Sequence, residues 1–147
     1  MNKSVMIVGV GGQGTLLASR ILGDAMMDQG YDVKVSEVHG MSQRGGSVVT
    51  YVRYGDKVYS PIIETGEADI VLAFEQLEAA RFLPYLKEGG TVVTSTQKID
   101  PMPVVTGEKE YPQDLLSEME EKGVNVLAVD ALKLAEEAGS QKAVNVV

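Results

Sequence analysis

The sequence contains no cysteine. Disulfide bonds, thiolate nucleophiles, cysteine-ligated zinc and cysteine-ligated iron–sulfur clusters are therefore excluded from this chain. His39 is the only histidine, and no G-x-S-x-G elbow is present, so neither a typical zinc site nor a serine triad is expected. We interpret His39 as a loop residue that bonds its neighbours or faces a subunit interface, in preference to a group that transfers protons.

Long apolar runs and basic stripes are missing as well. No apolar segment approaches the length that a bilayer requires, and no secretory cleavage site follows the N-terminus, so we expect a cytoplasmic protein without a membrane span. A net charge of -8 without a Lys/Arg stripe argues against nucleic acid as a partner. The 147 residues, 44% of them hydrophobic, predict one ordinary globular domain.

The glycine-rich stretch at residues 8–14 is the most informative feature of the chain. It lies between an apolar run and a segment with helical spacing, and so predicts a strand, a turn and a helix. Gly9 and Gly11 can adopt positive φ, and Gly14 allows close packing of helix on strand. Such a turn presents backbone N–H groups at a helix N-terminus, which predicts a phosphate-bearing nucleotide as ligand. A strand-to-helix connection without a ligand is the alternative.

The pattern along the chain predicts an α/β fold with a three-layer, Rossmann-like parallel sheet. Strands are expected at residues 4–9, 31–37, 47–54, 57–63, 68–74, 91–96 and 124–129, and helices at 16–29, 75–87, 112–122 and 130–138. The strands at 47–54 and 57–63 are separated by Gly55 and Asp56, which suits a hairpin turn. An antiparallel β-hairpin at about residues 47–63 is therefore expected within the sheet. Pro84 should kink the helix at 75–87, and Gly89 with Gly90 should end it.

The C-terminal region predicts Asp130 and Ser140 as helix N-caps. The chain then stops on the apolar run at residues 144–147, which a free terminus would rarely leave exposed. We expect residues 1–147 to be a single domain that is either truncated at its C-terminus or ends in a tail that docks on a partner.

A second polar, glycine-rich loop follows the second expected strand. Arg44 is its cation, flanked by Ser42, Gln43, Gly45 and Gly46. Loops at the carboxyl ends of neighbouring parallel strands face one crevice, so Arg44 is predicted near the glycine turn, where it could bind a phosphate or a partner's carboxylate. A solvent-exposed loop arginine is the alternative.

Glu37 ends the second expected strand, the position at which an acidic residue binds ribose in NAD enzymes. A nicotinamide cofactor is therefore a second possibility for the cleft, and a nucleotide-sensing module without chemistry is a third. A simpler role for Glu37 is an ion pair with Arg44 or Lys34.

Two motifs in this order, residues 9–14 and 41–47, resemble the gamma domain of the 2-oxoacid:ferredoxin oxidoreductases. The run at residues 37–46 looks most like the beta subunit of indolepyruvate ferredoxin oxidoreductase. The resemblance covers nearly the whole chain and implies oxidative decarboxylation of a 2-oxoacid with coenzyme A, giving an acyl-CoA, carbon dioxide and reduced ferredoxin.

The same resemblance implies that this chain is a non-catalytic subunit. Thiamine diphosphate, magnesium and iron–sulfur clusters would belong to a larger alpha subunit, since this chain lacks cysteine and a G-D-G motif with a downstream asparagine. Coenzyme A would bind at or near this domain, and ferredoxin would be reached through the complex. No catalytic or metal-binding residue is expected here, and the implied binding residues are Gly11, Gly12, Gln13, Gly14, Ser42, Gln43, Arg44 and Gly45.

Overall fold

The computed structural model describes residues 2–38 and 46–147. Within them a six-stranded sheet runs in the order β2-β3-β1-β4-β5-β6. Its strands are β1 (Lys3–Val10), β2 (Asp32–Val38), β3 (Ser47–Gly55), β4 (Ala68–Ala73), β5 (Leu86–Ser95) and β6 (Asn125–Val129). β1, β4, β5 and β6 are mutually parallel, whereas β3 is antiparallel to both of its neighbours. The predicted α/β fold with an antiparallel insertion in a largely parallel sheet is confirmed.

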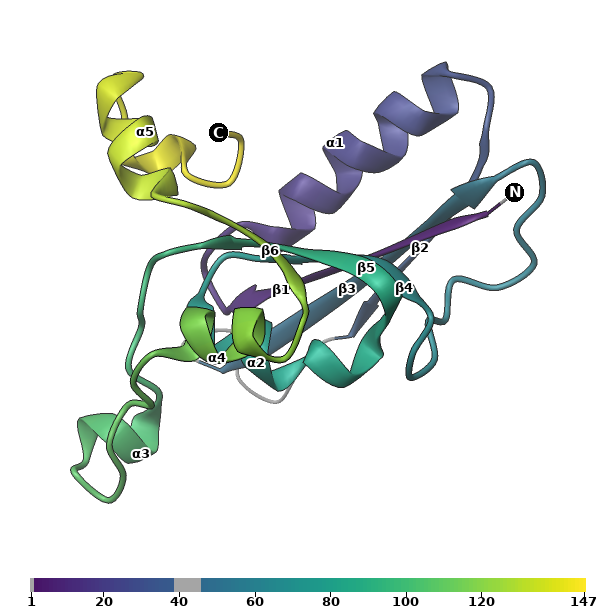
Figure 1. Cartoon of the computed structure of the whole chain (residues 1–147). Coiled ribbons are helices and arrows are strands. Elements are labelled where there is room, and N and C mark those ends of the chain that lie inside the picture. The colour runs from purple at the N-terminus through teal and green to yellow at the C-terminus, as the bar shows by residue number, and fades with distance from the viewer. Residues whose placement is uncertain (1, 39–45) are drawn as a thin grey trace.

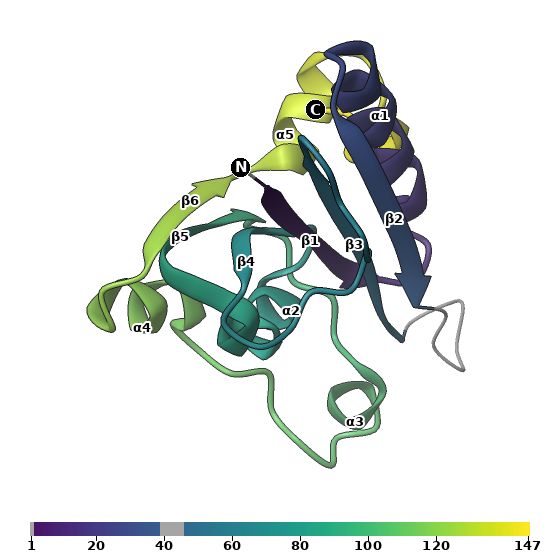
Figure 2. The ribbon, with the colours of Figure 1, turned by 90° about the vertical axis from the view of Figure 1, so that its right-hand side faces the viewer.

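Helices cover both faces of this sheet. They are α1 (Thr15–Asp28), α2 (Gln76–Arg81), α3 (Met102–Val105), α4 (Leu115–Glu121) and α5 (Ala131–Glu137), with short 3-10 turns η1 (Leu83–Tyr85) and η2 (Gln141–Ala143). Figure 1 shows α1 and α5 on one face and α2 and α4 on the other. The three predicted layers are therefore present, whereas α3 projects away from them in both overall views (Figures 1 and 2).

The hairpin predicted at residues 47–63 does not form, because only its first strand is present, as β3. β3 pairs with β2 on one side and with β1 on the other, so both of its edges are occupied and no strand forms at residues 57–63. Side chains hold that segment instead. The Arg53 guanidinium donates to the carbonyl oxygens of Ser60 and Ile62 at 3.1 and 3.2 Å, and the Asp32 carboxylate accepts from the Val58 N–H at 2.8 Å.

The helix predicted at residues 75–87 is also shorter than expected. α2 ends at Arg81, and η1 contains Pro84, whose missing N–H prevents a continuous helix. β5 then begins at Leu86, which pairs with Ala68, so Gly89 and Gly90 lie within a strand and do not end a helix. A Cβ at Gly90 would stand 2.9 Å from the Asp69 carbonyl oxygen, which explains the glycine there.

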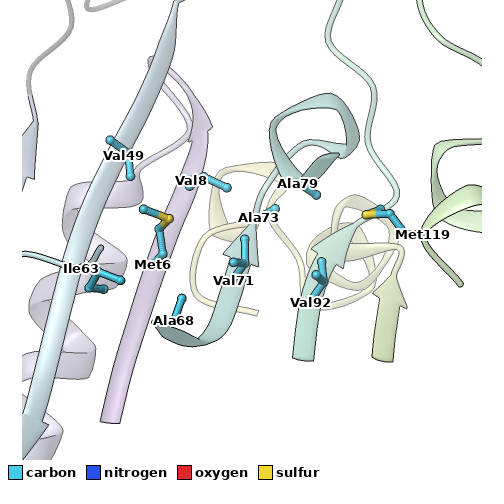
Figure 3. Packing of buried hydrophobic residues seen from close by; sticks show 10 residues of the cluster. All are labelled: Met6, Val8, Val49, Ile63, Ala68, Val71, Ala73, Ala79, Val92 and Met119. Carbon is cyan, nitrogen blue, oxygen red and sulfur yellow. The ribbon is translucent and has the colours of Figure 1, made fainter. Parts of the chain in front are cut away.

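β1 lies at the centre of the core because its apolar residues are buried on both faces. Met6 and Val8 pack with Val71, Val92 and other side chains toward α2 and α4 (Figure 3). Val5 and Ile7 pack on the opposite face against Val52, Phe74 and the inner side of α1. Burial of each such side chain contributes about 2 kcal/mol. The strand that leads into the glycine turn is thus the most firmly held element of the sheet.

Candidate functional site

The glycine turn lies at the carboxyl end of β1, between the two halves of the sheet. Chain connections run from β1 toward β2 on one side and from β4 toward β5 on the other, so this edge is the topological switch point at which α/β proteins bind ligands. Gly12 and Gly14 have φ of +97° and +79°, whereas Gly9 and Gly11, at which positive φ was expected, do not adopt it. A Cβ at Gly9 would stand 2.9 Å from Gln13 Oε1, so Gly9 is required for close packing instead.

Among the described residues, the N-terminus of α1 presents backbone donors at this turn that no hydrogen bond occupies. The first bond within the helix runs from the Ala18 N–H to the Gly14 oxygen at 3.2 Å, which leaves the N–H groups of residues 15–17 without an intrahelical acceptor. Gly14, the N-cap residue, has no side chain with which to cap the helix. These donors and the helix dipole favour an anion at this end of α1.

A cavity of about 310 Å³ opens beside these donors. One wall is formed by Gly11, Gly12, Gly14, Thr15 and Leu16, and the other by Glu37, Val38, Val48, Val49 and Thr50. The turn predicted to bind phosphate thus forms part of a real cavity. Glu37 gives the opposite wall a carboxylate, as an NAD-type site would require.

Gln13 holds the turn in place. Its Oε1 accepts the Val10 N–H at 2.7 Å, and its Nε2 donates to the Phe74 carbonyl oxygen at 2.9 Å. The side chain therefore bridges the carboxyl ends of β1 and β4. Because both ends of the amide are engaged within the chain, Gln13 can shape the cleft, and a ligand at the turn would meet the neighbouring backbone.

The second loop begins and ends beside the glycine turn. Val38, at the end of β2, lines the same cavity, and the Gly46 oxygen accepts the Gly11 N–H at 2.8 Å. The remaining loop residues singled out from the sequence lie outside the described residues; they are His39, Ser42, Gln43, Arg44 and Gly45.

A second cavity, of about 260 Å³, lies on the other side of the turn. It is lined by Gly12 and Gln13 together with Gln97, Leu132, Gln141, Lys142, Val144 and Asn145. Asn145 Nδ2 donates to the Gly14 oxygen at 3.3 Å, and a Cβ at Gly14 would stand only 2.4 Å from that nitrogen. Gly14 therefore accommodates the C-terminal segment, and not close packing of helix on strand as predicted.

A buried carboxylate next to the switch point was missed by sequence reasoning. Glu75 follows β4, is 1% exposed and caps α2, its Oε1 accepting the Glu78 N–H at 2.9 Å. Its Oε2 accepts the Ile99 N–H and the Tyr111 hydroxyl. Burial raises the pKa of Tyr111 well above its usual value, and the hydrogen bond to the negatively charged Glu75 carboxylate raises it further. The sequence signal was an acidic residue three positions before Glu78 at a helix start, a capping pattern.

Glu78, also buried, connects α2 to the end of the second loop. Its Oε2 accepts the Ser47 hydroxyl at 2.6 Å, and Arg81 Nε lies 3.3 Å from its Oε1.

In the part of the chain that the structure describes, no group of three or more acidic or histidine side chains could hold a metal ion. No described helix is both long and apolar enough to cross a bilayer.

Comparison with known proteins agrees with the resemblance. The family model of pyruvate ferredoxin/flavodoxin oxidoreductase matches residues 4–147. Indolepyruvate oxidoreductase subunit IorB of Pyrococcus horikoshii is 49% identical over 149 residues, which cover 98% of this chain and 73% of that protein. The same-named subunit of Archaeoglobus fulgidus is 42% identical, covering 100% of this chain and 74% of that protein.

Solved structures share the fold. The gamma subunit of a keto/oxoacid ferredoxin oxidoreductase from Geobacter sulfurreducens superposes with a TM-score of 0.66 at 23% identity, over 98% of this chain and 71% of that one. The 2-oxoglutarate:ferredoxin oxidoreductase of Magnetococcus marinus, solved with 2-oxoglutarate, coenzyme A and succinyl-CoA bound, gives 0.71 at 20% identity. There the match covers 98% of this chain but 22% of the other.

Proposed function

The chain belongs to the pyruvate ferredoxin/flavodoxin oxidoreductase family, and from that premise we propose that it is the small subunit of an indolepyruvate:ferredoxin oxidoreductase. As a member of this family it is an accessory subunit of a 2-oxoacid:ferredoxin oxidoreductase. The proposed reaction converts an arylpyruvate, coenzyme A and two oxidised ferredoxins into an arylacetyl-CoA, carbon dioxide, a proton and two reduced ferredoxins. The identity to IorB subunits supports the arylpyruvate as substrate.

The decarboxylation and the electron transfer belong to the larger subunit in this proposal. Iron–sulfur clusters need thiolate ligands and this chain has no cysteine, so its residues do not fit that group. The chain likewise lacks the thiamine diphosphate motif. We assign both cofactors, with magnesium, to the larger subunit, and we place the assembled enzyme in the cytoplasm.

The role that remains for this chain is to bind coenzyme A and to shape the cavity that holds it. The cavity beside the free N–H groups of α1 is the observation that carries this role. We assign the backbone of Gly12 and Gly14 to the phosphate groups of coenzyme A. Gly11, whose N–H is bonded to the Gly46 oxygen, would line the site and join the two loops, and Gln13 would hold the turn. Ser42, Gln43, Arg44 and Gly45 follow as the border of the same channel, since both ends of their loop adjoin the cavity.

Replacement of Gly12 by alanine tests the assignment in the reconstituted two-subunit enzyme. A Cβ at Gly12 would enter open space next to the cavity, with a backbone strain of about 1 kcal/mol. The added methyl group would keep a phosphate from approaching the backbone N–H groups, which should raise KM for coenzyme A about tenfold while leaving subunit assembly intact. Gly66→Ala is the matched control, because Gly66 also has positive φ (+80°) and open space but lies at the opposite edge of the sheet. Equal KM values for the two variants would remove the turn from the coenzyme site.

Glu37 in the cavity wall keeps a second candidate function in view. An NAD(P)-binding oxidoreductase or nucleotide-sensing module would bind NADH to the isolated chain, with the Glu37 carboxylate on the ribose hydroxyls. Titration of the isolated chain with NADH, followed by its fluorescence, separates the two. Saturable micromolar binding that Glu37→Gln abolishes would favour the nucleotide module over the oxidoreductase subunit.

A further inference from the structure

Residues 99–111 form an arm between β5 and α4. Figures 1 and 2 both show this arm, with α3 at its tip, projecting away from the sheet, and Figure 1 shows that it extends beyond the carboxyl edge of the parallel strands. The glycine turn lies at the same edge, at the end of β1. The arm and the two cavities of the candidate site therefore lie at the same edge of the sheet, and no residue of the arm lines either cavity.

The tip of the arm is apolar and exposed to solvent. Met102 and Val105 are 69% and 67% exposed, and neither belongs to a core cluster of the described residues. Backbone bonds within the arm hold its shape, among them Val105 N–H to the Pro101 oxygen at 3.0 Å and Lys109 N–H to the Pro103 oxygen at 3.0 Å. The turn is thus folded, but its apolar side chains remain exposed and are not buried against the rest of the chain.

The base of the arm is fixed by a buried side chain. Glu75 Oε2 accepts the Ile99 N–H at 2.9 Å and the Tyr111 hydroxyl, so one carboxylate holds both ends of the arm. Gln76 adds a bond from its Nε2 to the Thr96 oxygen at 2.5 Å. A buried carboxylate is unfavourable unless it is hydrogen-bonded in this way. The arm is consequently held in one orientation although its tip does not touch the core.

We propose that the arm docks into a pocket of the larger subunit, an inference that rests on the proposed function. Apolar groups on a rigid, exposed turn suit a protein interface, because little conformational entropy is lost on binding. Asp100, Glu108 and Glu110 against Lys109 give the arm an acidic margin. The complementary pocket is therefore apolar at its floor and basic at its rim.

The larger subunit, and not a second copy of this chain, is the occupant for two reasons. This chain is itself acidic, with a net charge of -8, so the overall field of a second copy repels the acidic arm. In the Magnetococcus marinus enzyme the matching region makes up 22% of one polypeptide, so the domain there is covalently joined to the rest of its chain. Because the arm and the glycine turn lie at the same edge, one partner bound there would contact the arm and also cover the glycine turn.

Site-specific crosslinking tests the location directly. Since the chain has no cysteine, Met102→Cys introduces a single thiol that can be labelled with benzophenone maleimide before the larger subunit is added. Ile62→Cys is the control, because Ile62 is 57% exposed and lies at the amino edge of the sheet. Illumination should join position 102, but not position 62, to the larger subunit. No product from position 102, or a product with a second copy of this chain, would overturn the proposal.

Affinity measurements provide the second test. Met102→Lys combined with Val105→Lys removes the apolar tip and opposes a basic rim, and should weaken binding to the larger subunit by about tenfold or more. Tyr59→Lys combined with Ile62→Lys is the control and should change affinity less than twofold; thermal unfolding checks that both fold. If the wild-type chain binds and the arm variant binds equally well, the arm proposal alone fails. If the wild-type chain does not bind the larger subunit, the proposed function fails with it.

Discussion

At the scale of single residues, Gln13 has the largest structural effect at the candidate site. Gln13→Leu would leave the Val10 N–H and the Phe74 oxygen without their present partner, at a cost of about 2 kcal/mol in the free energy of unfolding. Gln13→Glu keeps an acceptor for Val10 but sets a carboxylate oxygen against the Phe74 oxygen, so it should be destabilised as well. Urea denaturation of the isolated variants measures both values. Equal stability of Gln13→Leu and wild type would mean that the bridge does not hold the turn.

Tyr111 makes stability depend on alkaline pH. Its pKa lies above the ordinary value of 10.0 in the folded chain, so the folded state retains a proton that the unfolded state loses. The contribution of this proton to the free energy of unfolding is fully present below pH 10. It is lost as the pH rises above 10, by up to about 1.4 kcal/mol per pH unit. Urea titrations between pH 9 and 11 should show this slope in wild type and a smaller one in Tyr111→Phe. Tyr59→Phe, at an 86% exposed position, should keep the wild-type slope.

At the scale of elements, the local sequence pattern correctly predicted those helices, strands and turns that are determined by residues close together in the sequence. The continuous apolar run of β1, the glycines after it and the helical spacing of α1 identified the strand, turn and helix correctly. Residues 57–63 have strand-like composition, but a strand needs a free partner edge, and β3 has none left. The hydrogen bond from Tyr111 to Glu75 joins residues 36 positions apart, and no local sequence pattern predicts such a contact.

The segment that replaces the predicted second hairpin strand depends on Arg53. Arg53→Met removes the donors to the Ser60 and Ile62 oxygens, while its apolar stem keeps similar volume. Residues 57–63 should then open locally more often, and limited proteolysis under native conditions should cut there several times faster. Lys57→Met, in the same segment, is the control for lost charge. An unchanged cleavage rate would show that Arg53 does not hold the segment.

At the scale of the whole molecule, the sheet brings the elements of the candidate site and the arm to one edge. The glycine turn, both ends of the second loop and the base of the arm meet at the carboxyl ends of β1, β4 and β5. The sequence predicted that the two loops converge, because parallel strands end at a common edge. It did not predict the arm, whose direction is set by the buried Glu75.

Hydrogen–deuterium exchange of the reconstituted two-subunit enzyme, with and without coenzyme A, tests the central claim most directly. If the free N–H groups at the start of α1 bind coenzyme phosphates, coenzyme A should slow exchange in residues 11–17, and Gly12→Ala should reduce that protection. Peptides from α5 serve as the internal control and should exchange equally in both states. Unchanged exchange at residues 11–17 in an enzyme saturated with coenzyme A would contradict the account.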